Sequence, residues 1–435
     1  MNPLFPPTPG RLVAVLGILC LSLSADWPAF RGSDGSGVSR EAAPPTEWGE
    51  SRNRLWNTLL PGGGASSPIV VGDRVFVTSW TPSSGEAPLR RHLVCLDRES
   101  GRILWDKAVD AESNPDRYDG FLQEHGYASS TPACDGERVY VFFGRRGVLA
   151  FDQAGRELWQ ADVGAGSNAK GWGSASSPIL VGEVLVVSAS EESHAVYGFD
   201  RKTGRQLWKA EGAPLSNVFG TPAVASVGGR IEVLVSAPEE LWALNPENGR
   251  LRWYAQTGLP GNIAPSVVVG EGMAFAFGGF PKLGAVAVTL GGKGEVTSSN
   301  RVWSSNNSTY IPTPVYHQGR LHVVSDAGFA TCLDAGTGAL LYKERLPGAA
   351  AAGRGGKPFY AAAVLAGGQV YAVSRRNGVF VFPATPEFRL TARNTLPGDD
   401  SDFNAAPAIS GGRIYLRSNR YLYCLGTAPA RAGER

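Results

Sequence analysis

Short apolar runs separated by glycine-containing turns recur along nearly the whole chain. In nearly every copy a small residue and a proline precede an apolar run, and a glycine turn then leads into a second apolar run, as in residues 67–77 and 177–187. Proline at the start of a strand costs no ladder hydrogen bond. Runs this short, bounded by turn residues, predict β-strands rather than helices.

A second recurring unit follows the first. In it an apolar strand ends at Asp or Asn, a glycine comes four residues later, and an aromatic residue four after that. The clearest copies are Asp97, Gly101 and Trp105; Asp200, Gly204 and Trp208; Asn245, Gly249 and Trp253; and Asp334, Gly338 and Tyr342. The acidic or amide side chain can bond the turn backbone, and the glycine supplies positive φ at the turn exit. The fixed place of the tryptophan predicts a packing role between neighbouring sheets.

Together the two units supply four strands per repeat. The first unit starts at eight anchor positions, whose successive spacings range from 43 to 64 residues. The anchors are Pro68, Pro132, Pro178, Pro222, Pro265, Pro314, Ala363 and Pro407. Four strands in a period of about 40–45 residues are typical of a β-propeller. The sequence therefore predicts an all-β fold, an eight-bladed β-propeller of four-stranded antiparallel blades.

Both ends of the repeat region are incomplete. The last copy, residues 404–425, lacks a closing strand, whereas residues 54–60 form an apolar strand with nothing before it to pair with. Pairing these two segments would close the ring and remove an exposed sheet edge. We therefore predict that this N-terminal strand joins the last blade.

The chain divides into four segments. Residues 1–25 combine one charge, Arg11, with an apolar run too short to cross a hydrocarbon core of about 30 Å, and end in small residues. This pattern predicts a cleaved signal peptide and export to the periplasm or cell envelope of a bacterium; an uncleaved anchor is the alternative. We expect residues 26–53 to form an irregular arm over the ring, 54–426 the propeller, and 427–435 a C-terminal tail.

Composition agrees with this organisation and excludes some functions. Glycine (56) and proline (30) make up about a fifth of the 435 residues, which suits many turns. The 41 basic and 39 acidic residues nearly cancel, and this excludes a strongly basic nucleic-acid-binding protein. We expect a monomer with no transmembrane segment after signal cleavage.

The cysteines follow the repeat. Cys95, Cys332 and Cys424 occupy one repeated position, where other copies carry Ala or Gly, so the position requires a small side chain. We expect these thiols and Cys134 to be free and buried, although an exported chain could pair them as disulfides.

The repeat resembles that of pyrroloquinoline-quinone (PQQ) enzymes, in which an apolar residue, Asp and Gly precede Trp at this spacing. The resemblance runs from about Trp56 to Leu425, and residues 26–32 are similar to the start of exported quinone-type propellers. The same repeat occurs in the outer-membrane assembly lipoprotein, an eight-bladed scaffold without cofactor. The resemblance implies the propeller fold and leaves two functions open.

For the quinone dehydrogenases the resemblance implies adjacent cysteines over the cofactor, a calcium site of Glu, Asn and Asp, and a catalytic Asp. The chain has no adjacent cysteines, and its sequence offers no motif that places the other residues. We therefore expect no cofactor and a non-catalytic exported propeller, which acts as a binding or protein-interaction scaffold for a protein partner in the cell envelope. The alternative is a PQQ-dependent oxidoreductase of alcohol or sugar dehydrogenase type, with PQQ, calcium, and Lys170 and Trp172 near the quinone.

A ligand, if one binds, is expected at one mouth of the central channel. Residues just before the anchors should ring this mouth, where they offer hydrogen bonds, one positive charge and stacking faces for a planar or sugar-like ligand. They are His125, Lys170, Trp172, Asn217, Asn262, Tyr310, Tyr360 and Asn404. The alternative is that these residues only cap strands and satisfy backbone groups. No metal ligands are predicted, because the spacing of the five histidines does not suit a shared ion.

A polar insert at residues 110–127 interrupts the regular spacing. It carries Asp116, Arg117, Tyr118 and Glu124, among others. Long inserts on a rigid ring are usual places for recognition, and a solvated loop is the alternative.

Overall fold

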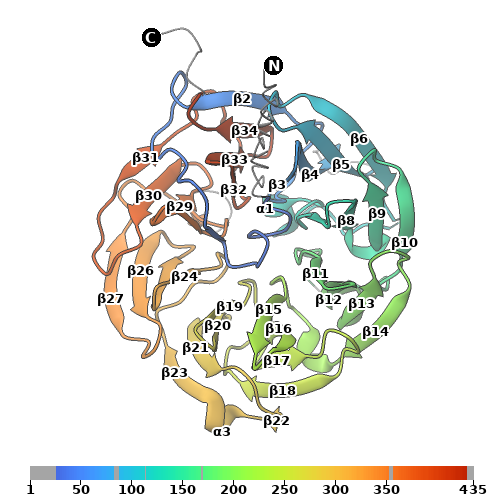
Figure 1. Ribbon diagram of the computed structural model, residues 1–435, viewed down its shortest axis with the longest axis vertical. Helices are drawn as coiled ribbons and strands as arrows, with labels where there is room; N and C mark the ends of the chain where they lie inside the picture. The colour runs from blue at the N-terminus through green and yellow to red at the C-terminus, as the bar shows by residue number, and fades with distance from the viewer. Residues whose placement is uncertain (1–25, 83–87, 113, 168–169, 352–355, 429–435) are drawn as a thin grey trace, which may run out of the picture.

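The computed structural model describes residues 26–82, 88–112, 114–167, 170–351 and 356–428. Within these residues the strands form eight sheets, each built on four antiparallel strands and arranged as blades around a central axis (Figure 1). The prediction of an eight-bladed, all-β propeller is confirmed. The signal-peptide prediction for residues 1–25 and most of the C-terminal tail, residues 429–435, lie outside the described residues.

The first four blades run in chain order, and the short first strand of each lies innermost (Figure 1). Blade 1 contains β3 (Ile69–Val71), β4 (Arg74–Thr81), β5 (Arg90–Asp97) and β6 (Ile103–Asp110). Blade 2 contains β7 (Ala133–Cys134), β8 (Arg138–Phe142), β9 (Val148–Asp152) and β10 (Glu157–Ala161). Blade 3 contains β11 (Ile179–Val181), β12 (Val184–Ala189), β13 (Ala195–Asp200) and β14 (Gln206–Glu211). Blade 4 contains β15 (Ala223–Val227), β16 (Arg230–Ala237), β17 (Glu240–Leu244) and β18 (Leu251–Gln256), with β22 (Gly294–Glu295) added outside β18.

The remaining blades follow the same order. Blade 5 contains β19 (Val268–Gly270), β20 (Met273–Gly278), β21 (Gly284–Thr289) and β23 (Arg301–Ser305). Blade 6 contains β24 (Val315–His317), β25 (Arg320–Val324), β26 (Phe329–Asp334) and β27 (Leu340–Arg345). Blade 7 contains β28 (Val364–Ala366), β29 (Gln369–Val373), β30 (Val379–Pro383) and β31 (Ala392–Asn394), with β1 (Val38–Ser39) added inside β28. Blade 8 contains β32 (Ala408–Ser410), β33 (Arg413–Arg417), β34 (Tyr421–Leu425) and β2 (Arg54–Leu59).

The helical segments are short connections. They are α1 (Leu122–His125), α2 (Ser190–Ser193), α3 (Thr297–Asn300) and the 3-10 turns η1 (Gly144–Arg146) and η2 (Ala213–Leu215). Among the described residues, no helix has the length and apolar character that a membrane crossing requires.

Blade 8 closes the ring with strands from both ends of the chain. β2 pairs antiparallel with β34, with Arg54 opposite Leu425 and Leu59 opposite Tyr421. Figure 1 shows the blue β2 lying against the red β34. The predicted closure is confirmed, and it leaves no gap between the first and last blades.

One predicted anchor is wrong by two residues. Pro265 was expected to start the inner strand of blade 5, yet β19 begins at Val268, and Val267 stands where six of the other blades carry proline and blade 7 carries Ala363. The backbone N–H of Ser266 bonds the Thr313 hydroxyl, so Ser266 holds the place that Ser or Thr holds just before the anchor in blades 1–4. Proline is not required here, because the strand start can use any residue that accepts extended geometry.

Tryptophans join most of the blades to one another. The indole N–H of a tryptophan in an outer strand donates to a backbone carbonyl in the turn of the following blade, at 2.8–3.2 Å. The pairs are Trp56–Arg98, Trp105–Gln153, Trp159–Arg201, Trp208–Pro246 and Trp303–Ala335. This confirms the predicted packing role. Trp253 departs from the pattern, because its N–H donates to the Glu232 carboxylate within its own blade, at 2.9 Å.

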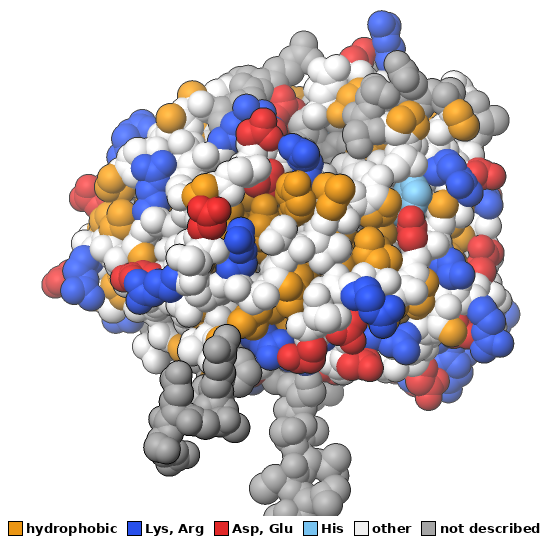
Figure 2. Space-filling model, turned by 90° about the horizontal axis from the view of Figure 1, so that it is seen from above, with side chains coloured by type: hydrophobic (Ala, Val, Ile, Leu, Met, Phe, Trp, Pro, Cys, Tyr) orange, Lys and Arg blue, Asp and Glu red, His pale blue; other side chains and the backbone are white. Residues whose placement is uncertain are grey.

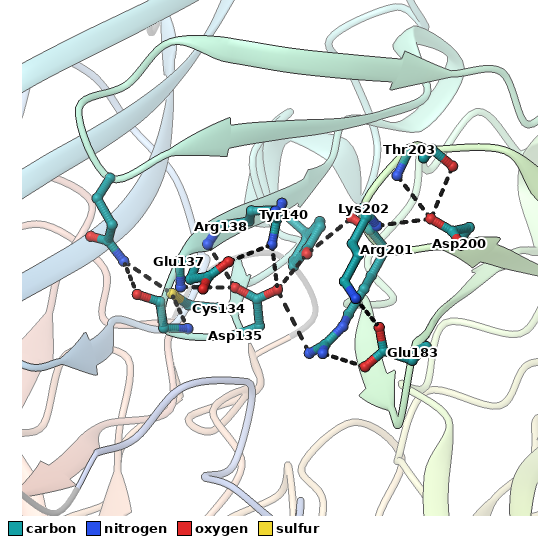
Figure 3. Close-up of polar contacts among 12 residues, drawn as sticks. Cys134, Asp135, Glu137, Arg138, Tyr140, Glu183, Asp200, Arg201, Lys202 and Thr203 are labelled. Atoms are coloured by element: carbon teal, nitrogen blue, oxygen red, sulfur yellow. Dashed lines mark hydrogen bonds and ion pairs between the residues drawn. The ribbon is translucent and has the colours of Figure 1, made fainter.

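A polar network reinforces the junction between blades 2 and 3 (Figure 3). The buried Asp135 carboxylate accepts a hydrogen bond from the Tyr140 hydroxyl at 2.7 Å and lies 3.7 Å from the Arg201 guanidinium of blade 3. The Arg201 carbonyl oxygen, which accepts from Trp159, lies 3.1 Å from the Tyr140 hydroxyl and shares that group's one hydrogen with Asp135. The turn that carries Arg201 in blade 3 therefore receives both the Trp159 contact and the Asp135–Tyr140 contact from blade 2.

The cysteines are free thiols inside the blades, as predicted. Cys95, Cys134, Cys332 and Cys424 are all buried and unpaired. Three of them lie opposite the blade aromatic in the strand register: Cys95 faces Trp105, Cys332 faces Tyr342, and Cys424 faces Trp56. Burial raises the pKa of the Cys95 thiol to about 12, which keeps it protonated and unreactive at neutral pH.

The arm at residues 26–53 enters the central channel. Trp27 exchanges backbone hydrogen bonds with Val70 of blade 1, the Cys134 N–H of blade 2 donates to the Pro28 carbonyl, and β1 pairs with blade 7. Figure 1 shows this blue segment crossing the centre of the ring. The first half of the arm is therefore held by inner strands, whereas Thr46 and Trp48 bond the Asn394 side chain on the outer strand β31.

Arg31 fixes the arm from within. Its guanidinium donates to the carbonyls of Thr313, Pro314 and Ala363, on blades 6 and 7, at 2.7–3.3 Å. It also bonds two carbonyls of the arm itself. Burial lowers the pKa of Arg31 to about 9, so this cation is held by backbone dipoles in a poorly solvated place.

The tryptophan junctions predict a position-dependent cost of adding a methyl group. A Cβ at Gly204, where φ is +74°, would lie 2.5 Å from Trp159, whereas a Cβ at Gly182, where φ is +59°, would meet nothing within 4 Å. We expect Gly182→Ala to lower the free energy of unfolding by about 1–2 kcal/mol, from backbone strain alone. Gly204→Ala should lower it by about 3 kcal/mol or more, because the displaced indole adds an overpacking cost. Urea denaturation of both variants measures the difference, and equal losses would contradict the role of the tryptophan.

Candidate functional site

A cavity of about 180 Å³ lies at one mouth of the central channel. Six of the eight residues predicted for this mouth line it: His125, Trp172, Asn262, Tyr310, Tyr360 and Asn404. The segments that precede the inner strands supply most of the wall, and Phe30 of the arm also lines the cavity. The structure thus brings these side chains together from six different blade connections and the arm.

A ring of hydroxyl groups runs around the cavity. Each backbone N–H at this level donates to a Ser or Thr hydroxyl of the next blade, at 2.9–3.0 Å. The ring runs from Ser67 through Thr131, Ser177, Thr221 and Ser266 to Thr313. Ala362 and Ala406 hold the corresponding lining positions in blades 7 and 8. Sequence reasoning missed these residues, although a Ser or Thr directly before most proline anchors was the available signal.

One wall of the cavity is aromatic. The Trp172 ring lies with its centroid 4.7 Å from that of Phe121 and 5.8 Å from that of Phe219, both in tilted arrangements. The Lys170 ammonium lies 4.6 Å from the Trp172 centroid and bonds the Asn262 side-chain oxygen at 2.6 Å. Lys170 therefore stands beside the cavity, over Trp172, rather than in its lining.

The opposite wall carries amides and phenols. The Asn262 amide donates to the Tyr310 hydroxyl at 3.0 Å, and the Asn404 oxygen accepts from Arg375 at 3.0 Å. The Arg375 guanidinium also lies 4.5 Å from the centroid of the Tyr360 ring. These contacts orient the amide and phenol groups that face the cavity.

His125 is a neutral member of the site. Its Nδ1 lies 2.6 Å from the Ser129 hydroxyl, and burial lowers the pKa of the imidazole to about 4. Because the imidazole is uncharged at pH 7, it can both donate and accept a hydrogen bond.

Asn217 lies beside the connection that carries Asn262, behind the cavity lining. It has φ of +57°, and its carbonyl accepts from the Ile263 N–H at 3.1 Å, next to a bridge between Val218 and Ile263. Asn217 is not among the cavity-lining residues. Asn tolerates this left-handed conformation, and such a turn explains the residue type without a ligand.

PQQ and calcium both need charged partners from the protein. Calcium takes six to eight oxygen ligands that usually include carboxylates, and the quinone itself carries carboxylates. None of the described residues lining the cavity is Asp, Glu, Lys or Arg. Nor do His, Cys, Asp and Glu gather anywhere in the described part of the chain in a group of three or more that could hold a metal ion. The described lining residues therefore do not fit this cofactor pair.

The polar insert at residues 110–127 packs onto blade 1. The rings of Tyr118 and Tyr127 lie with their centroids 5.0 and 5.1 Å from that of Trp80. α1 at the end of this insert carries His125 to the cavity. The insert therefore positions part of the site.

A second, smaller cavity of about 30 Å³ lies beside the first, and both share Ser129. Its charged lining residues pair as Arg91 with Glu112 and Arg145 with Asp116, each at 2.6 Å. Glu192, only 6 % exposed, contacts the Ser174 hydroxyl through one oxygen, and its other oxygen has no hydrogen-bond partner. Burial raises the pKa of Glu192 to about 7.

Comparison with known proteins supports the fold. The family model described as outer membrane protein assembly factor BamB matches residues 46–225, 90–311 and 292–386 in overlapping segments. No curated protein sequence matches the chain.

Several solved structures share the architecture at low sequence identity. BamB from Moraxella catarrhalis is 13 % identical with a TM-score of 0.60, and the match covers 88 % of this chain and 98 % of that one. A europium-containing methanol dehydrogenase is 10 % identical with a TM-score of 0.59, over 92 % and 89 % of the two chains. A quinohemoprotein alcohol dehydrogenase from Pseudomonas putida HK5 is 13 % identical with a TM-score of 0.54, over 94 % and 82 %. At this identity the likeness shows the fold alone.

The raised pKa of Glu192 predicts a pH-dependent effect of Glu192→Gln. A folded-state pKa above the unfolded value means that the native state loses stability as pH rises from about 4.5 to about 7, because a buried carboxylate must ionise. Glutamine stays neutral, so the variant should match the parent at pH 4 and be more stable at pH 8. Urea denaturation of both proteins between pH 4 and pH 8 measures this difference in the free energy of unfolding. Glu183→Gln is the control, because the pKa of the exposed Glu183 is lowered by Lys202 and Arg201; a similar gain there would contradict the burial argument.

Proposed function

Since the chain belongs to the family of PQQ-like propeller-repeat proteins described as outer membrane protein assembly factor BamB, we propose that it is an exported, non-catalytic propeller that binds a protein partner in the bacterial cell envelope. The partner contacts the outer strands of the blades. The observation that carries this proposal is the repeated exposure of large apolar side chains on those strands.

Six aliphatic side chains on outer strands are at least 41 % exposed. They are Leu59 on β2, Leu158 on β10, Leu251 on β18, Val302 on β23, and Leu340 and Leu341 on β27. On the side of the ring seen in Figure 2, hydrophobic side chains gather in a band between charged ones. Exposed apolar groups beside charged ones are typical of interaction surfaces.

The backbone of these strands adds a second mode of contact. β10 and β27 each pair with one neighbour, β9 and β26, and so present an open sheet edge. An extended segment of a partner can pair with such an edge through main-chain hydrogen bonds. In blade 4 the chain itself does this, because β22 lies outside β18.

Photo-crosslinking in the native envelope tests the proposal. A photoreactive residue at Leu158 or Leu340 should give a crosslinked adduct of discrete mass. In a second measurement, Leu158→Asp or Leu340→Asp should reduce the amount of partner recovered with the protein by about tenfold. This reduction corresponds to a loss of about 1.4 kcal/mol of binding energy. The control carries the probe at Lys282, an exposed residue outside the outer strands. Crosslinking at Lys282 but not at Leu158 or Leu340 would contradict binding through the outer strands.

The second candidate function is a PQQ-dependent oxidoreductase, favoured by the structural likeness to a methanol dehydrogenase and by the cavity at the channel mouth. Because none of the described residues that line the cavity has a charged side chain, we expect PQQ and Ca²⁺ to leave the thermal midpoint unchanged and to give a visible spectrum that is the sum of the components. A saturable spectral change together with a raised midpoint would overturn this expectation and favour the oxidoreductase.

A further inference from the structure

The cavity at the channel mouth is blind. Trp27 and β1 of the arm pair with inner strands of blades 1 and 7, and Arg31 bonds carbonyls of blades 6 and 7. Phe30, between Trp27 and Arg31 in the chain, lines the cavity. An occupant must therefore come from the mouth side and contact Phe30 as part of its floor.

The lining of this cavity is mainly apolar, with uncharged polar groups set among the apolar ones. Its described lining includes hydroxyl, amide, phenol and imidazole groups and no Asp, Glu, Lys or Arg side chain. A charged ligand would lose hydration there without an ion pair to any of the described lining side chains, which is costly, although the Lys170 ammonium lies beside the cavity. The lining therefore selects for a neutral occupant.

The hydrogen-bonding groups are spread around the circumference. The hydroxyl oxygens of Thr131, Ser177, Thr221, Ser266 and Thr313 each accept a backbone N–H, so each hydroxyl hydrogen remains to be donated elsewhere. These residues come from five successive blades, so the donors surround the channel axis. Such an arrangement suits a ligand whose own polar groups radiate from a ring.

Tyr360 supplies a polar group with no partner in the protein. Tyr360 lines the cavity, and its hydroxyl oxygen is buried without a hydrogen bond to any of the described residues. A buried hydroxyl without a partner costs stability, so an occupant that draws this hydroxyl toward the cavity would supply the missing bond. The Arg375 guanidinium over the Tyr360 ring holds it in place.

Trp172 gives the cavity a flat apolar wall. Phe121 and Phe219 flank it, and all three line the cavity. Pyranose rings present C–H groups on their faces and hydroxyl groups at their edges, which match an aromatic wall within a circle of polar groups. At about 180 Å³ the cavity is smaller than the roughly 300–1,000 Å³ of pockets for drug-sized ligands, so it suits a single ring.

We propose that this cavity binds one uncharged sugar unit, a neutral pyranose, in place of a cofactor and without chemical change. The sugar ring lies against Trp172, and its hydroxyl groups meet the ring of Ser and Thr hydroxyls, Asn262, Asn404 and Tyr360. This site is separate from the outer strands proposed for a protein partner, so either proposal can fail alone.

Ligand-observed NMR and calorimetric titration of the full mature chain with D-glucose, D-galactose, D-mannose and N-acetyl-D-glucosamine test the site. We expect saturable binding of at least one of them. Glucuronate, which keeps the pyranose ring but carries a carboxylate, should bind at least about tenfold more weakly than the best neutral sugar. No binding by any neutral sugar, or tighter binding of glucuronate, would overturn the proposal.

Two variants locate the binding. Tyr360→Phe removes a hydroxyl that makes no bond in the protein, so it should leave the thermal midpoint unchanged or raise it while weakening the sugar severalfold. Trp172→Ala should weaken the sugar by about tenfold, which corresponds to about 1.4 kcal/mol of aromatic contact. Ile231→Ala is the control, because Ile231 on β16 is 40 % exposed and does not line the cavity. Unchanged affinity in Tyr360→Phe and Trp172→Ala would overturn the assignment to this cavity.

Discussion

The contact between a tryptophan of one blade and the glycine turn of the next is the constraint on which the ring depends. Trp159 donates its indole N–H to the Arg201 carbonyl, and its ring covers Gly204 so closely that no side chain fits there. One hydrogen bond and one steric requirement thus set the position of the following blade. Since five junctions repeat this geometry, the blade angle is determined locally and the ring closes when β2 meets β34.

The position of the cavity follows from this constraint. Once the blades are held at a constant angle, the inner strands start at the same level, and in blades 1–5 the backbone N–H before the inner strand meets a hydroxyl of the next blade, as Thr131 meets Ser177. The hydroxyl circle is therefore part of the architecture as well as part of the cavity wall. Chemistry specific to this chain comes from the connections above it, such as the insert that carries His125 and the segment that carries Trp172. A shared fold accordingly leaves the function open.

The sequence predicts correctly the features that depend on residues close together in the chain or on an unpaired sheet edge, and it fails where other contacts between distant segments decide the structure. The turn with Asp200 and Gly204 and the closure by residues 54–60 could be predicted, because local turn chemistry and one unpaired edge determine them. The positions of Asn217 and Phe30 could not, because they depend on how a connection crosses between blades and how far the arm enters the channel. The wrong anchor at Pro265 has the same origin. The hydrogen bond between Ser266 and Thr313 of the next blade sets where β19 starts, and a nearby proline does not.

The arm gives the channel its electrostatic character. Arg31 is a buried cation whose guanidinium is engaged by backbone carbonyls, and burial lowers its pKa to about 9. Because those carbonyls already accept from its N–H groups, the guanidinium has few hydrogen-bond donors left for an anion in the cavity. Phe30 beside it adds an apolar surface to the floor. Hydrogen bonds between neutral groups are stronger in such a poorly solvated place than in water. A floor of this kind therefore favours a neutral, hydrogen-bonding occupant over a charged one.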